Sequence, residues 1–168
     1  MLQRLLSLDF SISARLRIAE QPGALRRLAA LLAHSGDSWF WLLGLAAVWL
    51  LGSPGWKMRT VIMFFGIAGT AGLVMALKFT IRRRRPTGEW GEIYRRADPH
   101  SFPSGHAARA VMLAVVGLGL GPTWLGAVLV VWAPLVGLAR VAMGVHYFSD
   151  VAAGMLLGIL TGLVTLIL

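Results

Sequence analysis

Five apolar segments, joined by short connections, occupy most of the chain from residue 38 to its end. A helix crosses the apolar core of a bilayer with about 20 residues. With 57% hydrophobic residues, the chain is also more apolar than an ordinary soluble domain. We therefore predict an all-α, polytopic membrane helical bundle of about five transmembrane helices, with residues 1–168 as a single domain. The expected spans are Ser38–Leu51, Thr60–Ile81, Ala107–Gly121, Thr123–Ala139 and Val151–Leu168.

The first 35 residues differ from the rest because basic and apolar residues alternate there at roughly helical spacing. This pattern predicts one or two amphipathic helices that lie in the membrane interface, broken at Pro22-Gly23, ahead of a transmembrane core over residues 36–168. Charged residues interrupt every apolar run in this region, so no cleaved signal peptide is expected. The first span, Ser38–Leu51, is short and ends at the turn signal Gly52-Ser53-Pro54-Gly55.

The formal net charge of +9 indicates an anionic binding partner. In a soluble chain this charge would suggest that the partner is nucleic acid. Here the basic residues cluster beside apolar spans, so we expect a lipid bilayer and an anionic headgroup or substrate, and no nucleic acid. The chain has no cysteine, which excludes disulfides and thiolate chemistry.

Three polar clusters stand at the ends of the apolar segments. Lys78 and Arg85 offer a point charge and a planar fork for phosphate oxygens, and Pro86 ends the first cluster. In the second cluster, Ser104 can cap a helix whose free N–H groups, at Gly105 and His106, would face an anion. The sequence therefore predicts a phosphate site at one edge of the membrane.

The third cluster supplies reactive groups. His146 and Asp150 are four residues apart, a spacing that on a helix brings the carboxylate within reach of one ring nitrogen. The other nitrogen would then act as a nucleophile. Arg140 adds a second guanidinium, and His106 is the candidate general acid. Because these cations and the helix end can stabilise the transferred phosphate, we expect no metal and no cofactor.

Each cluster alone has an ordinary explanation, as lipid anchors, a helix cap or a capping pair. Alternating spans, however, place all three clusters at the same side of the membrane, which independent structural roles would not require. Ionisable residues at the membrane edge are also costly enough to indicate function.

The same residues resemble the three-part signature of the type 2 phosphatidic acid phosphatase superfamily. The matching motifs are Lys78 to Arg85-Pro86, Pro103-Ser104-Gly105-His106, and Arg140 with His146 and Asp150, in this order. The resemblance covers about residues 58–168 and implies a metal-independent membrane phosphatase with a phosphohistidine intermediate. It implies His146 as nucleophile, Asp150 as its orienting partner and His106 as acid. The phosphate would be held by Lys78, Arg85, Ser104, Gly105 and Arg140. The family commonly has serine where this chain has Ala139, so one hydroxyl contact is expected to be lost.

For a substrate we expect a lipid phosphate or diphosphate, such as undecaprenyl diphosphate, phosphatidylglycerol phosphate or phosphatidic acid. Bacterial members of the family usually work on the outer face of the inner membrane, so we predict a multi-pass inner-membrane protein with a periplasmic site. A simple count of positive charges favours the cytoplasmic side instead. The main alternative is a non-enzymatic protein that binds or transports anionic lipids; a haloperoxidase has similar motifs but is soluble.

Three further features carry expectations. Gly154, Gly158 and Gly162 form a stripe that predicts close packing between helices of the same chain. The less favoured alternative is that the stripe joins two copies in a weak dimer, so we expect a monomer or a weak dimer. Pro134 is expected to kink its helix. Residues 86–102 are expected to form a polar loop.

Overall fold

The computed structural model describes residues 2–168; Met1 lies outside the described residues. Within that range the chain forms eight helices and no strand, in agreement with the predicted all-α class. The helices are α1 (Leu2–Leu16), α2 (Ala24–Ser35), α3 (Ser38–Leu51), α4 (Pro54–Ile81), α5 (Glu89–Ala97), α6 (Gly105–Leu120), α7 (Thr123–Ala142) and α8 (Phe148–Ile167).

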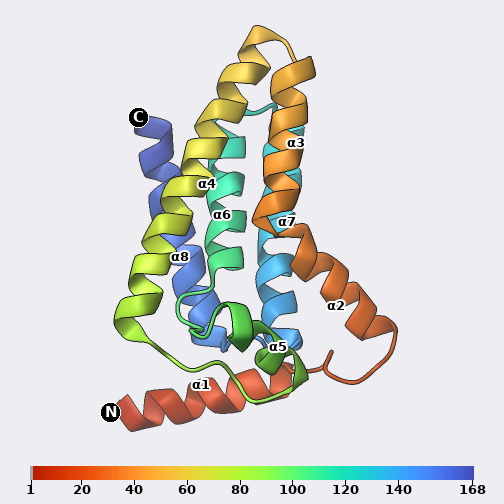
Figure 1. The fold of residues 1–168 in the computed structure, drawn as a ribbon, viewed down its shortest axis with the longest axis vertical. Coiled ribbons are helices and arrows are strands. Elements are labelled where there is room, and N and C mark those ends of the chain that lie inside the picture. Colours follow the sequence, from red (N-terminus) through yellow and green to blue (C-terminus); the bar gives the residue numbers. More distant parts are fainter. Residues whose placement is uncertain (1) are drawn as a thin grey trace.

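Five of these helices, α3, α4, α6, α7 and α8, run side by side as a bundle (Figure 1). They correspond to the five predicted spans, and the chain is a multi-pass membrane protein. Helices α4, α7 and α8 are long and apolar enough to cross a membrane, whereas α3 and α6 are apolar but have only 14 and 16 residues. Helix α6 packs against α4, α7 and α8, so the core forms around it.

The N-terminal segment contains two helices, as the alternation of basic and apolar residues predicted. Helix α1 lies across one end of the bundle, and α2 leads obliquely from there into α3 (Figure 1). Several apolar side chains of α1 are exposed, among them Leu8, at 57%, and Phe10, at 50%. This exposure fits a helix that lies in the membrane interface. Helix α2 buries Ala29 and Ala33, and packs against α7.

Two expectations about connecting segments are corrected. Residues 86–102 are not a simple loop, because they contain α5. This helix has Glu89 and Glu92 in its first turn and Arg95 and Arg96 in its last, and these charges interact favourably with the helix dipole. The segment is too polar to show the apolar periodicity from which a helix is predicted. Helix α4 also starts six residues earlier than expected, with Pro54 in the first helical turn, where a missing N–H costs little. Helix α7 continues as a helix through Pro134.

The glycine stripe of α8 packs against α6 within the same chain. A Cβ atom at Gly154 would lie 2.5 Å from the carbonyl oxygen of Ser104, and one at Gly158 would lie 2.3 Å from that of Ala108. At Gly162 it would lie 2.7 Å from Cβ of Val115. Only glycine allows the two backbones to approach this closely. The predicted intramolecular contact is confirmed, and α6 leaves no room at these glycines for a second copy of the chain.

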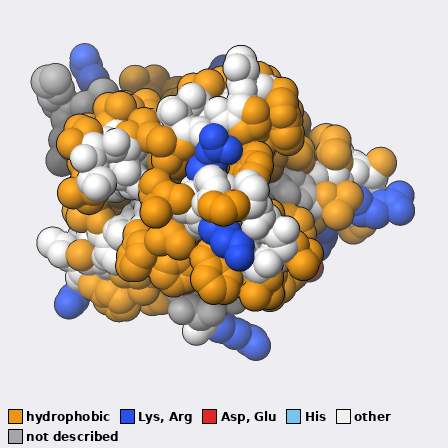
Figure 2. Space-filling model, turned by 90° about the horizontal axis from the view of Figure 1, so that it is seen from above, with side chains coloured by type: hydrophobic (Ala, Val, Ile, Leu, Met, Phe, Trp, Pro, Cys, Tyr) orange, Lys and Arg blue, Asp and Glu red, His pale blue; other side chains and the backbone are white. Residues whose placement is uncertain are grey.

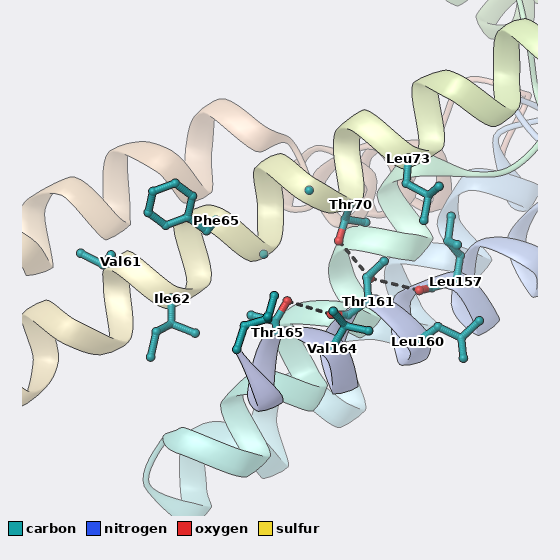
Figure 3. Close-up of a pocket in the computed structure, with 13 residues that line it drawn as sticks. Val61, Ile62, Phe65, Thr70, Leu73, Leu157, Leu160, Thr161, Val164 and Thr165 are labelled. Atoms are coloured by element: carbon teal, nitrogen blue, oxygen red, sulfur yellow. Dashed lines mark hydrogen bonds between the residues drawn. The ribbon is translucent and has the colours of Figure 1, made fainter.

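A groove of about 650 Å³ lies between α4 and α8 (Figure 3). Its walls are aliphatic and aromatic side chains plus three threonines. The Thr70 hydroxyl donates to Oγ1 of Thr161 at 2.9 Å, and the hydroxyls of Thr161 and Thr165 donate to carbonyls of their own helix. No charged side chain of residues 2–168 lines this groove, so it lacks the cationic donors that hold a phosphate.

Candidate active site

The ends of the helices that carry the three clusters meet at the end of the bundle where α1 and α5 lie (Figure 1). A cavity of about 550 Å³ opens there. Of the eight predicted site residues, the cavity is lined by Lys78, Arg85, Gly105, His106, Arg140 and His146. The predicted convergence of the clusters is therefore observed. Ser104 and Asp150 are fully buried and lie outside the lining.

Lys78 and Arg85 are brought to the cavity by the end of α4. Lys78 lies in the last turn of α4, and Arg82 follows with a left-handed φ of 52°, which ends the helix and turns the chain. Both cationic side chains are buried and both donate to Oδ2 of Asp98, Arg85 at 2.7 Å. One carboxylate oxygen thus occupies the two donors that we expected to hold a phosphate.

Asp98 was not found by reasoning from the sequence. Burial by itself would raise the pKa of this carboxyl, but the hydrogen bond and charge of Lys78, followed by the charge of Arg85, outweigh burial and lower it. Asp98 is therefore ionised at neutral pH. An incoming phosphate would have to replace it at these cations.

The second cluster starts α6 as predicted. Ser104 is the N-cap, and its hydroxyl accepts a long hydrogen bond of 3.5 Å from the N–H of Ala107. The backbone N–H of Ser104 donates to the carbonyl oxygen of Asp150 at 2.9 Å, which ties α6 to the first turn of α8. Gly105 and His106 follow at the cavity wall. Ser104 thereby holds the helix end in place, while its two neighbours face the cavity.

His146 lies between Arg85 and Asp150. Nη1 of Arg85 is 3.1 Å from Nε2 of His146, and Nδ1 of His146 is 3.5 Å from Oδ2 of Asp150. A guanidinium can only donate, so Nε2 must carry the lone pair, and a neutral ring then holds its proton on Nδ1, on the side of Asp150. The expected tautomer follows from the contact with Arg85, because Nδ1 itself makes no hydrogen bond to a described residue and only lies near the Asp150 carboxylate.

The reason for the proximity of His146 and Asp150 differs from the expected one. We predicted a shared helix face, but α8 begins at Phe148, and His146 precedes it. Asp150 instead belongs to a capping box, in which its Oδ2 accepts from the N–H of Tyr147 at 2.9 Å. The cap folds the chain back so that residue 146 approaches the first helical turn.

The surroundings of His146 keep its imidazole neutral. Burial is the largest cause that lowers its pKa well below the ordinary value of 6.5, and the charges of Arg85, Arg140 and Lys78 lower it further. The charge of Asp98 acts in the opposite direction but is outweighed. A neutral ring with a free lone pair is the form in which histidine is a nucleophile.

Arg140 enters the cavity from the last turn of α7 and is held by α5. Its Nη1 donates to the hydroxyl of Tyr94 at 2.9 Å, and its guanidinium lies 4.4 Å from the centre of the Tyr94 ring. Tyr94 also lies 5.7 Å from the guanidinium of Arg85. The helix that the sequence did not predict therefore positions two of the expected phosphate-binding arginines.

Residues that the sequence analysis did not predict also bind Asp150, on the side away from His146. Nη1 of Arg83 donates to Oδ1 of Asp150 at 2.7 Å, and Nη2 donates to Asp9 of α1 at 2.6 Å. Asp9 also accepts from the backbone and hydroxyl of Ser149. The signal in the sequence was the polar pair Asp9 and Ser13, four residues apart on one face of an amphipathic helix, and the structure buries both. Helix α1 is thus joined by hydrogen bonds to the Asp150–His146 pair.

Comparisons with known proteins agree with this architecture. The family model described as the PAP2 superfamily matches residues 59–168. The undecaprenyl-diphosphatase BcrC of Bacillus subtilis is 30% identical over 122 residues, which cover 70% of this chain and 62% of that relative, so the chain spans less than two thirds of its length.

Two crystal structures have the same fold. One is Aquifex aeolicus LpxE, with a TM-score of 0.77 over 96% of both chains. The other is the first transmembrane PAP2 type phosphatidylglycerolphosphate phosphatase from Bacillus subtilis, with a TM-score of 0.78 over 96% of this chain and 84% of that one. Both are 26% identical to this chain. Motifs, fold and family model together show that the chain belongs to the PAP2 superfamily.

Proposed function

We propose that this protein is an integral-membrane lipid phosphate or diphosphate phosphatase that works through a phosphohistidine intermediate without a metal. The observation that carries the proposal is the cavity at one end of the bundle, where Lys78, Arg85 and Arg140 surround the neutral imidazole of His146. Three buried cations around one nucleophile suit a dianionic group and its transition state.

The reaction has two steps. First, Nε2 of His146 attacks phosphorus, the bond to the leaving oxygen breaks, and His106 gives its proton to that oxygen. Second, a water molecule attacks the phosphohistidine, its proton passes to His106, and the bond between nitrogen and phosphorus breaks. Lys78, Arg85, Arg140 and the N–H groups at the start of α6 hold the phosphate oxygens in both steps. Asp150 stabilises the positive charge on His146.

A lipid is the substrate class that the walls of the cavity favour. Beside the cations, the cavity is lined by Trp39 of α3 and by Ala71, Val74 and Met75 of α4. Trp39 and Met75 are 61% and 44% exposed, on the apolar surface that faces the bilayer. A phosphate at the cations would therefore have its apolar chain beside α3 and α4. The names of the relatives suggest undecaprenyl diphosphate and phosphatidylglycerol phosphate as the first substrates to test.

We place the site on the periplasmic face of a bacterial inner membrane. The opposite end of the bundle shows mostly hydrophobic side chains with separate patches of Lys and Arg (Figure 2). Lys57 and Arg59 lie in the first turns of α4, near that end. At the site end, Lys78 and Arg85 line the cavity, where they serve to bind the substrate, so they are left out of a positive-inside count. This orientation leaves Leu168 in the cytoplasm. A reporter enzyme that is active only in the periplasm should therefore be inactive when fused at Leu168, and activity of the fusion would contradict the orientation.

The proposed function is tested by phosphate release from a panel of lipids. Purified protein in detergent, with EDTA present, is offered undecaprenyl diphosphate, phosphatidylglycerol phosphate and phosphatidic acid. We expect inorganic phosphate from at least one of them at a rate that EDTA does not change. A protein that binds vesicles of these lipids but releases phosphate from none would instead be a lipid-binding or transport protein.

A further inference from the structure

His106 has a carboxylate partner that comes from outside the three motifs. Nε2 of His106 lies 2.7 Å from Oδ1 of Asp37, in the connection between α2 and α3, and both side chains are largely buried, with 18% and 19% exposed. The two residues are 69 positions apart, and Asp37 lies outside the part of the chain that the family model matches. Each histidine of the cavity therefore faces its own carboxylate.

The position of Asp37 at the start of α3 would normally give its side chain a role in capping that helix. It is the N-cap residue of α3, and an aspartate at that position usually accepts from the N–H groups of its own helix. Its side chain makes no such bond. Oδ2 instead faces Nδ1 of His34 at 3.0 Å and accepts from Nε1 of Trp39 at 3.3 Å, which leaves Oδ1 directed at His106.

The backbone next to Asp37 is also anchored to α6. The guanidinium of Arg109 donates twice to the carbonyl oxygen of Gly36, at 3.0 and 2.6 Å. His106 and Arg109 are three residues apart and so share a face of α6. A Cβ atom at Gly36 would lie 2.9 Å from a side-chain methyl group of Val136, so the connection also packs closely on α7. These contacts hold the Asp37 carboxylate in a defined position at the cavity.

The charges around His106 explain what Asp37 contributes. The other groups of the cavity near His106 are Arg109 of α6, Arg140 of α7, Lys78 and Arg85, all cationic, together with neutral His146; Asp98 is engaged by Lys78 and Arg85. A protonated imidazole among such cations is unfavourable unless a carboxylate faces it. Burial would raise the pKa of Asp37, but the hydrogen bonds and charges of His106 and His34 lower it strongly, so Asp37 is ionised.

We propose that Asp37 is a positioning residue for the general acid: its carboxylate holds Nε2–H of His106 and stabilises the imidazolium, so that Nδ1–H is presented to the leaving oxygen. Asp37 stays ionised throughout and transfers no proton. The proton on the leaving oxygen comes from His106, and water restores it in the second step. This inference rests on the proposed phosphatase function, and it assigns a catalytic contribution to the N-terminal region before residue 59.

Two phosphate monoesters with the same apolar chain test this role. One has an alkyl leaving group, which needs a proton, and the other a nitrophenyl leaving group, which departs without one. We expect Asp37→Asn to lower kcat/KM for the alkyl ester by about 10²-fold and to leave the nitrophenyl ester nearly unaffected. The basic limb of the pH profile for the alkyl ester should move to lower pH by about 1 to 2 units, because the imidazolium has lost its counter-charge.

The controls separate positioning from folding. His106→Ala should show the same dependence on the leaving group, and the double variant should be no slower than His106→Ala alone. Asp37→Glu should recover part of the activity, and Glu89→Gln, which removes an exposed carboxylate paired with Arg26, should behave as the wild type. Equal losses on both esters, or no loss on either, would overturn the role of Asp37. Absence of phosphate release by the wild type from every substrate would instead refute the proposed function, and the inference with it.

Discussion

Replacing His146 with alanine is expected to lower phosphate release by about 10⁴-fold or more, because the reaction then has no nucleophile that can form the covalent intermediate. Wild-type protein mixed with ³²P-labelled lipid phosphate and quenched rapidly should carry label that is lost in acid and retained in base, as expected for phosphohistidine. The variant should carry none.

The contacts of the two ring nitrogens indicate that Nε2 is the one that reacts. Nε2 of His146 faces Arg85 in the cavity, whereas Nδ1 faces buried Asp150. His146→Gln keeps much of the side-chain volume and should be as inactive as alanine. The low pKa of His146 also means that its ring stays neutral well below pH 6.5, so the acid limb of the wild-type pH profile should lie below that value. Labelling that persists in either variant would refute His146 as the nucleophile.

The second large effect is expected at Arg85. Its guanidinium binds the carboxylate and the carbonyl oxygen of Asp98, and also reaches Nε2 of His146. Arg85→Lys keeps the charge but replaces a planar fork with a point donor, which cannot maintain these contacts together. We expect kcat to fall by about 10²- to 10³-fold, the usual effect of removing one transition-state donor, measured as phosphate release at saturating substrate.

The same run of arginines provides a matched control. Arg84 is exposed, whereas Arg85 is only 3% exposed. Arg84→Lys should therefore retain wild-type kcat. Full activity of Arg85→Lys would mean that charge alone binds the phosphate, and that the fork geometry observed here has no role in the reaction.

The parts of the site that could be predicted are those in which residues close together in the sequence are also close together in the structure. Lys78 lies at the end of an apolar helix, and Ser104 to His106 begin the next one, so the polar clusters could be placed at the helix ends without a structure. His146 and Asp150 were also paired correctly, although the reason was a capping box and not a shared helix face.

The carboxylates of the site were not predictable in this way. Asp98 lies 20 residues from Lys78, Asp37 lies 69 from His106, and Asp9 lies 74 from Arg83. No periodicity connects such residues, and each has a plausible local role, as part of a polar loop, an N-cap or a charge on an amphipathic helix.

The membrane bundle, and the basic and imidazole groups at one edge of it, could be predicted without a structure, because apolar length and helix termination depend on residues that are neighbours in the chain. Which carboxylate faces which cation or histidine could not be predicted and follows from the packing of separate helices. Such pairs depend on distances of a few ångströms between separate segments, and these distances are set by how α1, α5 and the connection between α2 and α3 pack on the bundle.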